Sequence, residues 1–273
     1  MTGSRGVGAT LAAAREQERA VLVGYLPVGF PDVDTSVAAM VAMVEAGVDV
    51  VEVGVPYSDP LMDGPLIQAA VEAALRGGAR PRDAIAAAGA VAATGAPALV
   101  MTYWNLVDRY GVEAFARDLA GAGGAGLITP DLIPEEAGGW LDAAESHDLD
   151  RVFLVAPSST DARLVSTTRA CRGFVYAAST MGVTGTRTSV GDAAQVLVER
   201  TRAVTDLPVC VGLGVSDGAQ AAEVAAFADG VIVGSALVRC LVDASSPQQG
   251  VDAVSRLSAE LAEGVRSGRA RRP

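Results

Sequence analysis

Short runs of β-branched and other apolar residues recur along the chain, and each is followed by an alanine-rich segment of helical length. This alternation is typical of βαβ units, in which helices join parallel strands. Eight units in one unbroken series favour a closed (β/α)8 TIM barrel over an open doubly wound sheet, because the strand count matches a barrel and no GxGxxG follows the first strand. The predicted strands are 20–25, 48–54, 98–103, 126–129, 151–155, 174–178, 208–212 and 230–233.

We expect the barrel to form a single domain over residues 1–273, because no low-complexity linker divides the chain and a TIM barrel needs roughly 250 residues. The N-terminal segment 1–19 contains a predicted extra helix over 8–18, placed to close the bottom of the barrel. Residues 265–273 are rich in arginine, and we expect a disordered basic tail there rather than a binding arm, since chain ends are usually loose.

The charge and composition exclude several classes of partner. A net charge of -11 argues against a surface for nucleic acid, which needs clustered basic residues. The N-terminus lacks the apolar core of a signal peptide, and glycine and proline interrupt the uncharged stretch 84–107. We interpret that stretch as a helix, a turn and a strand rather than a membrane span. The chain is therefore expected to be cytoplasmic and to bind neither nucleic acid nor membranes.

Neither the cysteines nor the histidine suggest a metal site. Cys171, Cys210 and Cys240 are far apart and form no CxxC pair, which predicts neither zinc nor a disulfide framework. The single histidine, His147, lies in a polar segment, and we interpret it as a helix-end residue rather than a catalytic one.

One acid, Glu52, interrupts the apolar run of the second strand. In a TIM barrel, chemistry occurs where the strands end and the βα loops begin. Side chains alternate along a strand, so Glu52 shares a face with Val50 and Gly54, either inside the barrel mouth or against the helices. Burial in either place raises the pKa of a carboxyl toward the range useful for proton transfer at neutral pH. A buried ion pair with an arginine is the structural alternative.

The loop after this strand, PYSDPLMDGP, supplies two more acids, Asp59 and Asp63. Prolines flank them and Gly64 closes the segment, so we expect a stiff loop over the same mouth. Two carboxyls in different environments have different pKa values and can play separate catalytic roles.

Glycines follow the last two predicted strands. Gly214 comes after the seventh, and Gly234 with Ser235 comes after the eighth. Backbone N–H groups at a helix start bind phosphate, and TIM barrels often place that site here. Each glycine alone is also compatible with an ordinary turn, but together they predict a phosphate site. The segment STMGVTGTRTSV after the sixth strand is glycine-rich, and on its own pattern it could be a flexible linker.

The segment EVGVPYSDPLMDGPLIQ resembles the signature of tryptophan synthase α subunits, and similar segments run from GYLPVGFPD through MTYWNLV and ITPDLIP to GSALV. The resemblance implies a lyase that cleaves indole-3-glycerol phosphate to indole and glyceraldehyde 3-phosphate by a retro-aldol reaction. It implies that Glu52 is the general acid and base and that Asp63 holds the indole N–H. Both roles suit the reaction, because C3 of indole must gain a proton while the ring nitrogen develops positive charge.

The resemblance also implies a lid at GVTG, with Thr184 near the catalytic aspartate and Gly185 near the phosphate. The substrate would further contact aromatic and apolar residues at strand ends, although an aromatic there is often simply core. The candidates are Tyr25, Met101, Tyr103, Ile128 and Tyr176. Tyr25 stands where phenylalanine is common in the family, with Pro27 nearby, which alters the expected shape of the pocket.

The family works as a complex with a pyridoxal-phosphate β subunit, so the resemblance implies an α2β2 assembly and no cofactor in this chain. Pro56 and Asp59 are the candidate contacts with that partner, because a stiff loop at the mouth can touch partner and substrate together.

Two other functions fit part of the pattern. A phosphate-binding sugar-phosphate isomerase or epimerase would share the glycines, but it would not need the second acid loop, and epimerases use metal-binding histidines that this chain lacks. A non-catalytic subunit that activates a partner would have vestigial acids, whereas here both acids and the GVTG segment are intact.

Overall fold

The computed structural model describes residues 6–179, 187–212 and 214–269, apart from the side chains of residues 187–190 and 269. Within these ranges, eight parallel strands pair in sequence order and the last pairs with the first, so the sheet closes into a barrel. This confirms the predicted TIM barrel. The strands β1 to β8 are Val21–Pro27, Val50–Gly54, Ala98–Met101, Gly126–Thr129, Asp150–Val155, Val175–Ala178, Val209–Gly212 and Gly230–Val233.

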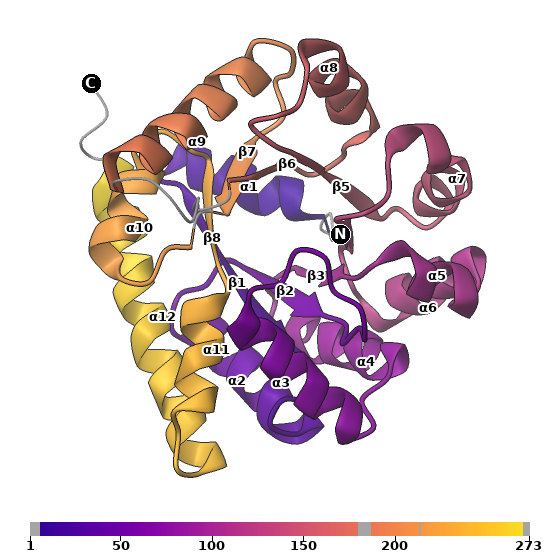
Figure 1. Ribbon diagram of the computed structural model, residues 1–273, viewed down its shortest axis with the longest axis vertical. Helices are drawn as coiled ribbons and strands as arrows, with labels where there is room; N and C mark the ends of the chain where they lie inside the picture. Colours follow the sequence, from indigo (N-terminus) through magenta and orange to yellow (C-terminus); the bar gives the residue numbers. More distant parts are fainter. Residues whose placement is uncertain (1–5, 180–186, 213, 270–273) are drawn as a thin grey trace.

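Helices surround the strands in a ring (Figure 1). The helices that follow the successive strands and complete the ring are α2 Val33–Glu45, α4 Pro81–Ala92, α6 Val112–Ala122, α7 Gly138–Ser146, α8 Asp161–Ala170, α9 Arg187–Arg202, α10 Gly218–Ala225 and α12 Pro247–Arg269. Additional helices lie in the connections: α3 Pro65–Arg76, α5 Trp104–Tyr110, the 3-10 turn η1 Pro134–Glu136 and α11 Ser235–Val242. None of the helices described is long and apolar enough to cross a membrane.

The N-terminal helix α1, Val7–Glu16, lies across the end of the barrel opposite the βα loops, behind the strands in Figure 1. Its buried residues Val7, Leu11 and Ala14 join the cluster of inward-facing strand residues. The backbone N–H of Val7 also donates to the buried Asp150 carboxylate at 2.7 Å. These contacts confirm the predicted closure of the barrel bottom.

The predicted strand boundaries agree with the structure to within two residues, and the larger differences have local causes. The third strand ends at Met101 rather than at residue 103, because Tyr103 caps the start of α5. The helix α2 begins after Asp32, its N-cap, whose carboxylate accepts the N–H of Thr35. Residues 84–107 form the predicted helix, turn and strand and continue into α5.

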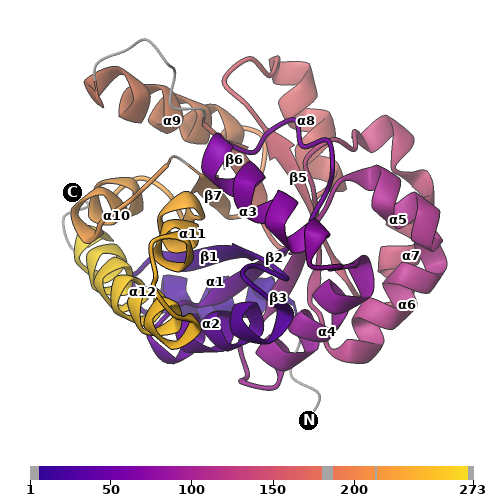
Figure 2. The same ribbon diagram turned by 60° about the horizontal axis from the view of Figure 1, so that its bottom comes forward.

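The prediction of a disordered tail from residue 265 is wrong for residues 265–269, which belong to α12. Val265 is buried, and α12 packs closely along α10 (Figure 2). Gly264 and Gly268 allow this approach: a Cβ on Gly264 would lie 2.0 Å from the Gly218 carbonyl oxygen, and one on Gly268 would lie 2.2 Å from that of Ala222. The remaining residues of the basic segment lie outside the described part of the chain.

Inside the barrel, apolar side chains fill the lower layers, and larger polar side chains occupy the end from which the βα loops leave. The register pairs Tyr25 on β1 with Glu52 on β2, so the two side chains are neighbours on the inner face of the sheet. The rings fit because glycines face them: a Cβ on Gly54 would lie 2.5 Å from the Tyr25 hydroxyl, and one on Gly212 would lie 2.8 Å from the Tyr176 hydroxyl. The fold thus gathers two tyrosines and an acid at the mouth.

Candidate active site

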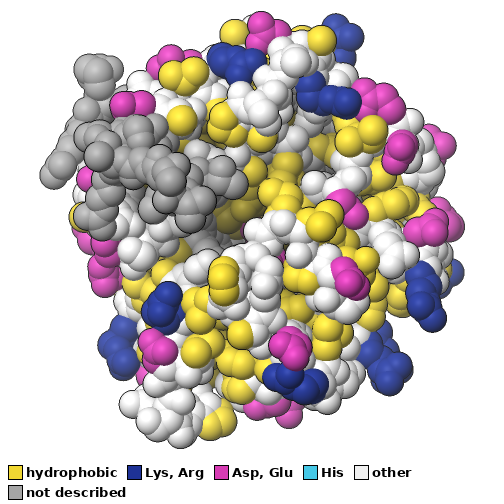
Figure 3. All heavy atoms as spheres, viewed as in Figure 1, with side chains coloured by type: hydrophobic (Ala, Val, Ile, Leu, Met, Phe, Trp, Pro, Cys, Tyr) yellow, Lys and Arg dark blue, Asp and Glu magenta, His cyan; other side chains and the backbone are white. Residues whose placement is uncertain are grey.

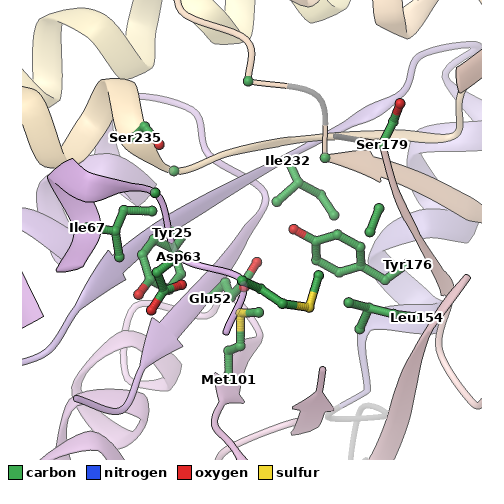
Figure 4. Close-up of a pocket in the computed structure, with 16 residues that line it drawn as sticks. Tyr25, Glu52, Asp63, Ile67, Met101, Leu154, Tyr176, Ser179, Ile232 and Ser235 are labelled. Atoms are coloured by element: carbon green, nitrogen blue, oxygen red, sulfur yellow. The ribbon is translucent and has the colours of Figure 1, made fainter. Parts of the chain in front are cut away.

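A cavity of about 410 Å³ opens at the centre of the βα-loop face. Apolar side chains gather around this opening in Figure 3. Figure 4 shows side chains from different strands pointing into one space. The lining residues are Tyr25, Glu52, Met62, Asp63, Gly64, Ile67, Met101, Leu154, Tyr176, Ala178, Ser179, Gly212, Gly214, Ile232, Gly234 and Ser235.

Glu52 points into this cavity rather than toward the helices, and only 1% of the residue is exposed. Its Oε2 has no hydrogen-bond partner among the described residues, and no arginine side chain that the structure describes forms the ion pair that was the predicted alternative. Burial, with a smaller contribution from the nearby charge of Asp63, raises the pKa of Glu52 to about 8. At neutral pH this carboxyl therefore carries a proton that it can give away.

Asp63 reaches the same cavity from the loop between β2 and α3. It is partly exposed, and burial of the rest raises its pKa from the ordinary value of an aspartate. Its backbone carbonyl accepts the Gln68 side-chain amide at 2.8 Å, which ties the end of the loop to α3. Two carboxyls thus share the cavity in unequal environments, the arrangement in which one serves as acid and the other as anion.

Tyr25, Met101 and Tyr176 line the cavity, as the sequence predicted. Burial, together with the nearby acids, raises the pKa of both tyrosines well above 10, so their hydroxyls are protonated donors.

Two other residues predicted for the indole pocket do not line it. Ile128 faces the barrel interior and is fully buried within the apolar cluster below the cavity. Tyr103 follows the end of β3, and its hydroxyl accepts the backbone N–H groups of Leu61 and Met62. It therefore contacts the acid loop, because the chain has already left the barrel wall at this point.

The residues predicted for phosphate line the same cavity as the acids. Gly214, Gly234 and Ser235 all line it, and α11 begins at Ser235 with Gly234 as its N-cap. A Cβ on Gly234 would lie 3.2 Å from the Tyr25 ring, so the glycine also keeps the cavity open. Thr184 and Gly185, predicted for the lid, lie outside the described residues.

The sequence interpretation missed several lining residues. Leu154 and Ile232 alternate with buried strand neighbours, so strand periodicity could have identified their inward face. Met62, Ile67 and Ser179 depend on the path of a loop or on where a strand stops, and no periodic signal marks them.

Of the two predicted partner contacts, only Asp59 is on the surface. Pro56 is buried, which contradicts its prediction as a surface contact. The loop instead exposes Leu61, with 83% of its surface accessible, and Met62, with 48%.

The remaining polar candidates form no second site in the described part of the chain. All three cysteines are free, and His147 ends α7, as predicted, with its Nε2 2.7 Å from a carboxylate oxygen of Glu113. No group of three or more His, Cys, Asp or Glu residues that could hold a metal ion occurs within the described ranges.

The fold and the cavity define a TIM-barrel enzyme with an acid-base site next to glycine-rich helix starts. The chain belongs to the tryptophan synthase alpha chain family, whose family model matches residues 11–266. It is therefore a lyase of tryptophan biosynthesis, which sets aside a sugar-phosphate isomerase or epimerase.

The similarity to known members extends over nearly the whole chain. The tryptophan synthase alpha chain of Salinispora arenicola is 64% identical over 261 residues, which cover 96% of this chain and 98% of that protein. That of Mycobacterium tuberculosis is 62% identical over 262 residues, covering 96% and 95%. Among solved structures, a tryptophan synthase from M. tuberculosis has a TM-score of 0.88 at 62% identity, covering 95% of this chain and 98% of that one. The alpha subunit from Legionella pneumophila has a TM-score of 0.87 at 29% identity, covering 97% and 99%.

Proposed function

We propose that this chain cleaves indole-3-glycerol phosphate to indole and glyceraldehyde 3-phosphate, with Glu52 as general acid and base and Asp63 as the anion near the indole nitrogen. The observation that carries the proposal is the buried Glu52 carboxyl, whose Oε2 has no partner among the described residues and whose pKa is raised to about 8 beside a second acid. Such a group is protonated in the free enzyme at neutral pH and is poised to transfer that proton.

The reaction uses this proton in a fixed order. Glu52 first protonates C3 of the indole ring, and the ring nitrogen then carries positive charge that the Asp63 carboxylate stabilises. The bond between C3 and the adjacent glycerol carbon breaks as the hydroxyl on that carbon loses its proton to the Glu52 carboxylate. The bonding electrons return to the indole ring, the glycerol carbon becomes an aldehyde, and Glu52 regains its proton.

The sequence excludes the other common route for breaking an aldol bond, a covalent intermediate on a lysine side chain. All 21 residues counted as lysine or arginine are arginines, so the chain has no lysine at all. Proton transfer by the carboxyls is therefore the chemistry that these side chains can supply.

The rest of the cavity suits the two ends of the substrate. Met101, Leu154 and Tyr176 provide apolar surface for an indole ring between the strand ends. Gly234 and Ser235 supply backbone N–H groups at the start of α11 for the phosphate. A cavity of about 410 Å³ lies within the usual range for small-molecule sites, ~300–1,000 Å³.

The direct test is to mix the purified chain with indole-3-glycerol phosphate and follow indole by chromatography. We expect indole to form with the chain alone and Asp63→Asn to abolish nearly all of it. A wild-type chain that releases no indole in any condition would support a non-catalytic subunit instead.

The pH dependence tests which form of Glu52 starts the reaction. Because the pKa is raised to about 8, the protonated form predominates below that pH and is lost above it. We expect kcat/KM to be level near neutrality and to fall tenfold per pH unit well above pH 8, because kcat/KM reports the free enzyme. A rate that rises with pH through this region would mean that the carboxylate acts first.

The phosphate site is tested by Gly234→Asp. The new side chain places a negative charge at the start of α11 and a Cβ against the Tyr25 ring. We expect glycerol phosphate, which competes with substrate in the wild type, to bind at least tenfold more weakly, measured by its inhibition constant. If glycerol phosphate inhibits the variant as strongly as the wild type, the assignment of the phosphate site to Gly234 is wrong.

The proposed partner is a tryptophan synthase β subunit in an α2β2 complex, supported by the family and by the solved structures described as tryptophan synthase. Pyridoxal phosphate would belong to that partner, because this chain has no lysine to hold it covalently. Asp59 remains the proposed contact on the exposed loop, and we propose a cytoplasmic location for the chain.

A further inference from the structure

The acid loop comprises residues 55–64, and its middle part, residues 57–62, is tied to the rest of the barrel by one side chain. Tyr103 lies just after β3, and its hydroxyl oxygen accepts the N–H of Leu61 at 2.9 Å and that of Met62 at 3.0 Å. A phenolic oxygen has two acceptor positions, and the loop uses both. Leu61 and Met62 immediately precede Asp63, so the two hydrogen bonds fix the backbone from which the acid projects.

Little else holds this part of the loop. Leu61 is 83% exposed and Met62 is 48% exposed, so apolar burial contributes little to their placement. Within the described part of the chain, residues 57–62 make no other hydrogen bond to a different element; Ser58 bonds only to the adjacent Asp59. The ring of Tyr57 stacks on that of Tyr103, with centroids 4.8 Å apart, and adds a second contact to the same residue.

Tyr103 is itself rigidly placed. It is only 6% exposed, and it caps the start of α5. Both carboxylate oxygens of Asp131, in the loop after β4, accept the N–H of the next residue, Trp104, at 2.9 and 3.1 Å. The hydroxyl therefore projects from a fixed point on the barrel toward a loop that has few other contacts.

We propose that Tyr103 is a positioning residue that holds the loop backbone so that Asp63 faces the substrate beside Glu52. The inference rests on the proposed function, because it assigns to Tyr103 an effect that acts through Asp63. It replaces the sequence-based prediction that Tyr103 contacts the indole ring directly.

Tyr103→Phe isolates the hydroxyl, because the ring can still stack on Tyr57 while both N–H groups lose their acceptor. Hydrogen exchange measures the loop without reference to catalysis, and we expect the amides of Leu61 and Met62 to exchange about tenfold faster in the variant. Tyr57→Phe is the matched control, since the Tyr57 hydroxyl makes no hydrogen bond within the described structure, and it should leave both amides at the wild-type rate.

Catalysis gives the second measurement. We expect Tyr103→Phe to lower kcat for indole release by roughly tenfold to a hundredfold, because a displaced catalytic group loses its alignment. KM and glycerol phosphate affinity should stay within about twofold, because Tyr103 does not line the cavity and its hydroxyl contacts the backbone of Leu61 and Met62 rather than Gly234 or Ser235. In an Asp63→Asn background the same change should cost nothing further, since the effect acts through Asp63.

These results separate the possible failures. If the two amides exchange equally fast in wild type and Tyr103→Phe, the loop is not held by the hydroxyl and the inference is overturned. Faster exchange with unchanged kcat, or an equal further loss in the Asp63→Asn background, overturns the positioning role. If Asp63→Asn itself keeps full activity, the proposed function is wrong, whatever the exchange rates show.

Discussion

Replacing Glu52 with glutamine is expected to stop indole release almost completely. The amide preserves the volume and burial of the side chain, but it can neither give a proton to C3 nor take one from the substrate hydroxyl. General acid-base catalysis contributes about a hundredfold to ten-thousandfold, and we expect kcat to fall by at least the lower value. Single-turnover assays with a sensitive indole readout should measure this loss, whereas near wild-type turnover would mean that another group moves the proton.

The thermal stability of Glu52→Gln serves as a control for folding. The pKa of Glu52 rises from 4.5 in the unfolded chain to about 8 in the folded one, so the folded protein holds the proton more tightly. That difference stabilises the wild type fully below pH 4.5, and the contribution is lost as pH rises through 8. Glutamine never ionises, so the melting temperature of Glu52→Gln at pH 9 should exceed that of the wild type. A lower value at pH 9 would show that the substitution damages the fold.

Gly264→Ala is expected to give the largest loss of stability from a single methyl group. The new Cβ would lie 2.0 Å from the Gly218 carbonyl oxygen and 2.7 Å from its Cα, so two backbones must separate where α12 packs on α10. Overpacking of this kind costs about 1–3 kcal/mol, and chemical denaturation should show that decrease in the free energy of unfolding.

Gly191→Ala is the matched control for this prediction. Gly191 lies within α9, and a Cβ there would meet no described atom outside its own helix turn within 4 Å. Alanine favours a helix over glycine by about 0.5–1 kcal/mol, so this variant should be as stable as the wild type or more stable. If both alanines shift stability in the same direction, helix propensity rather than the α10–α12 contact controls the outcome.

The sequence predicted the number and order of the strands, because each buried parallel strand is a short apolar run that needs little context to recognise. It could not predict which way Glu52 points. Alternation assigns a residue to one of two faces, but only closure of the barrel decides which face is inside. In the structure Glu52 lines the cavity beside its strand partner Tyr25, so the inner face is the one that carries the acid.

The sequence-based predictions for Tyr103 and Ile128 were wrong because the local sequence does not show where a residue lies relative to the cavity. The register pairs Ile128 with Met101, which lines the cavity, yet Ile128 itself packs wholly within the inward-facing apolar cluster. Tyr103 lies beyond the last paired residue of its strand, where the chain turns into α5. Similarity to the family motifs predicted that these residues lie near the active site. It could not predict their individual contacts, which depend on how the loops pack together.

The Tyr25 ring fills the space beside Gly54 on the neighbouring strand, so a substitution at either position limits the residues that the other can accept. The Tyr25 phenol occupies the volume that a side chain at position 54 would need, because a Cβ there would lie 2.5 Å from the Tyr25 hydroxyl oxygen. A descendant of this chain that gained even an alanine at position 54 could keep its cavity only with a smaller residue at position 25. Positions 25 and 54 should therefore vary as a pair, and pocket shape should change in steps that involve both strands together.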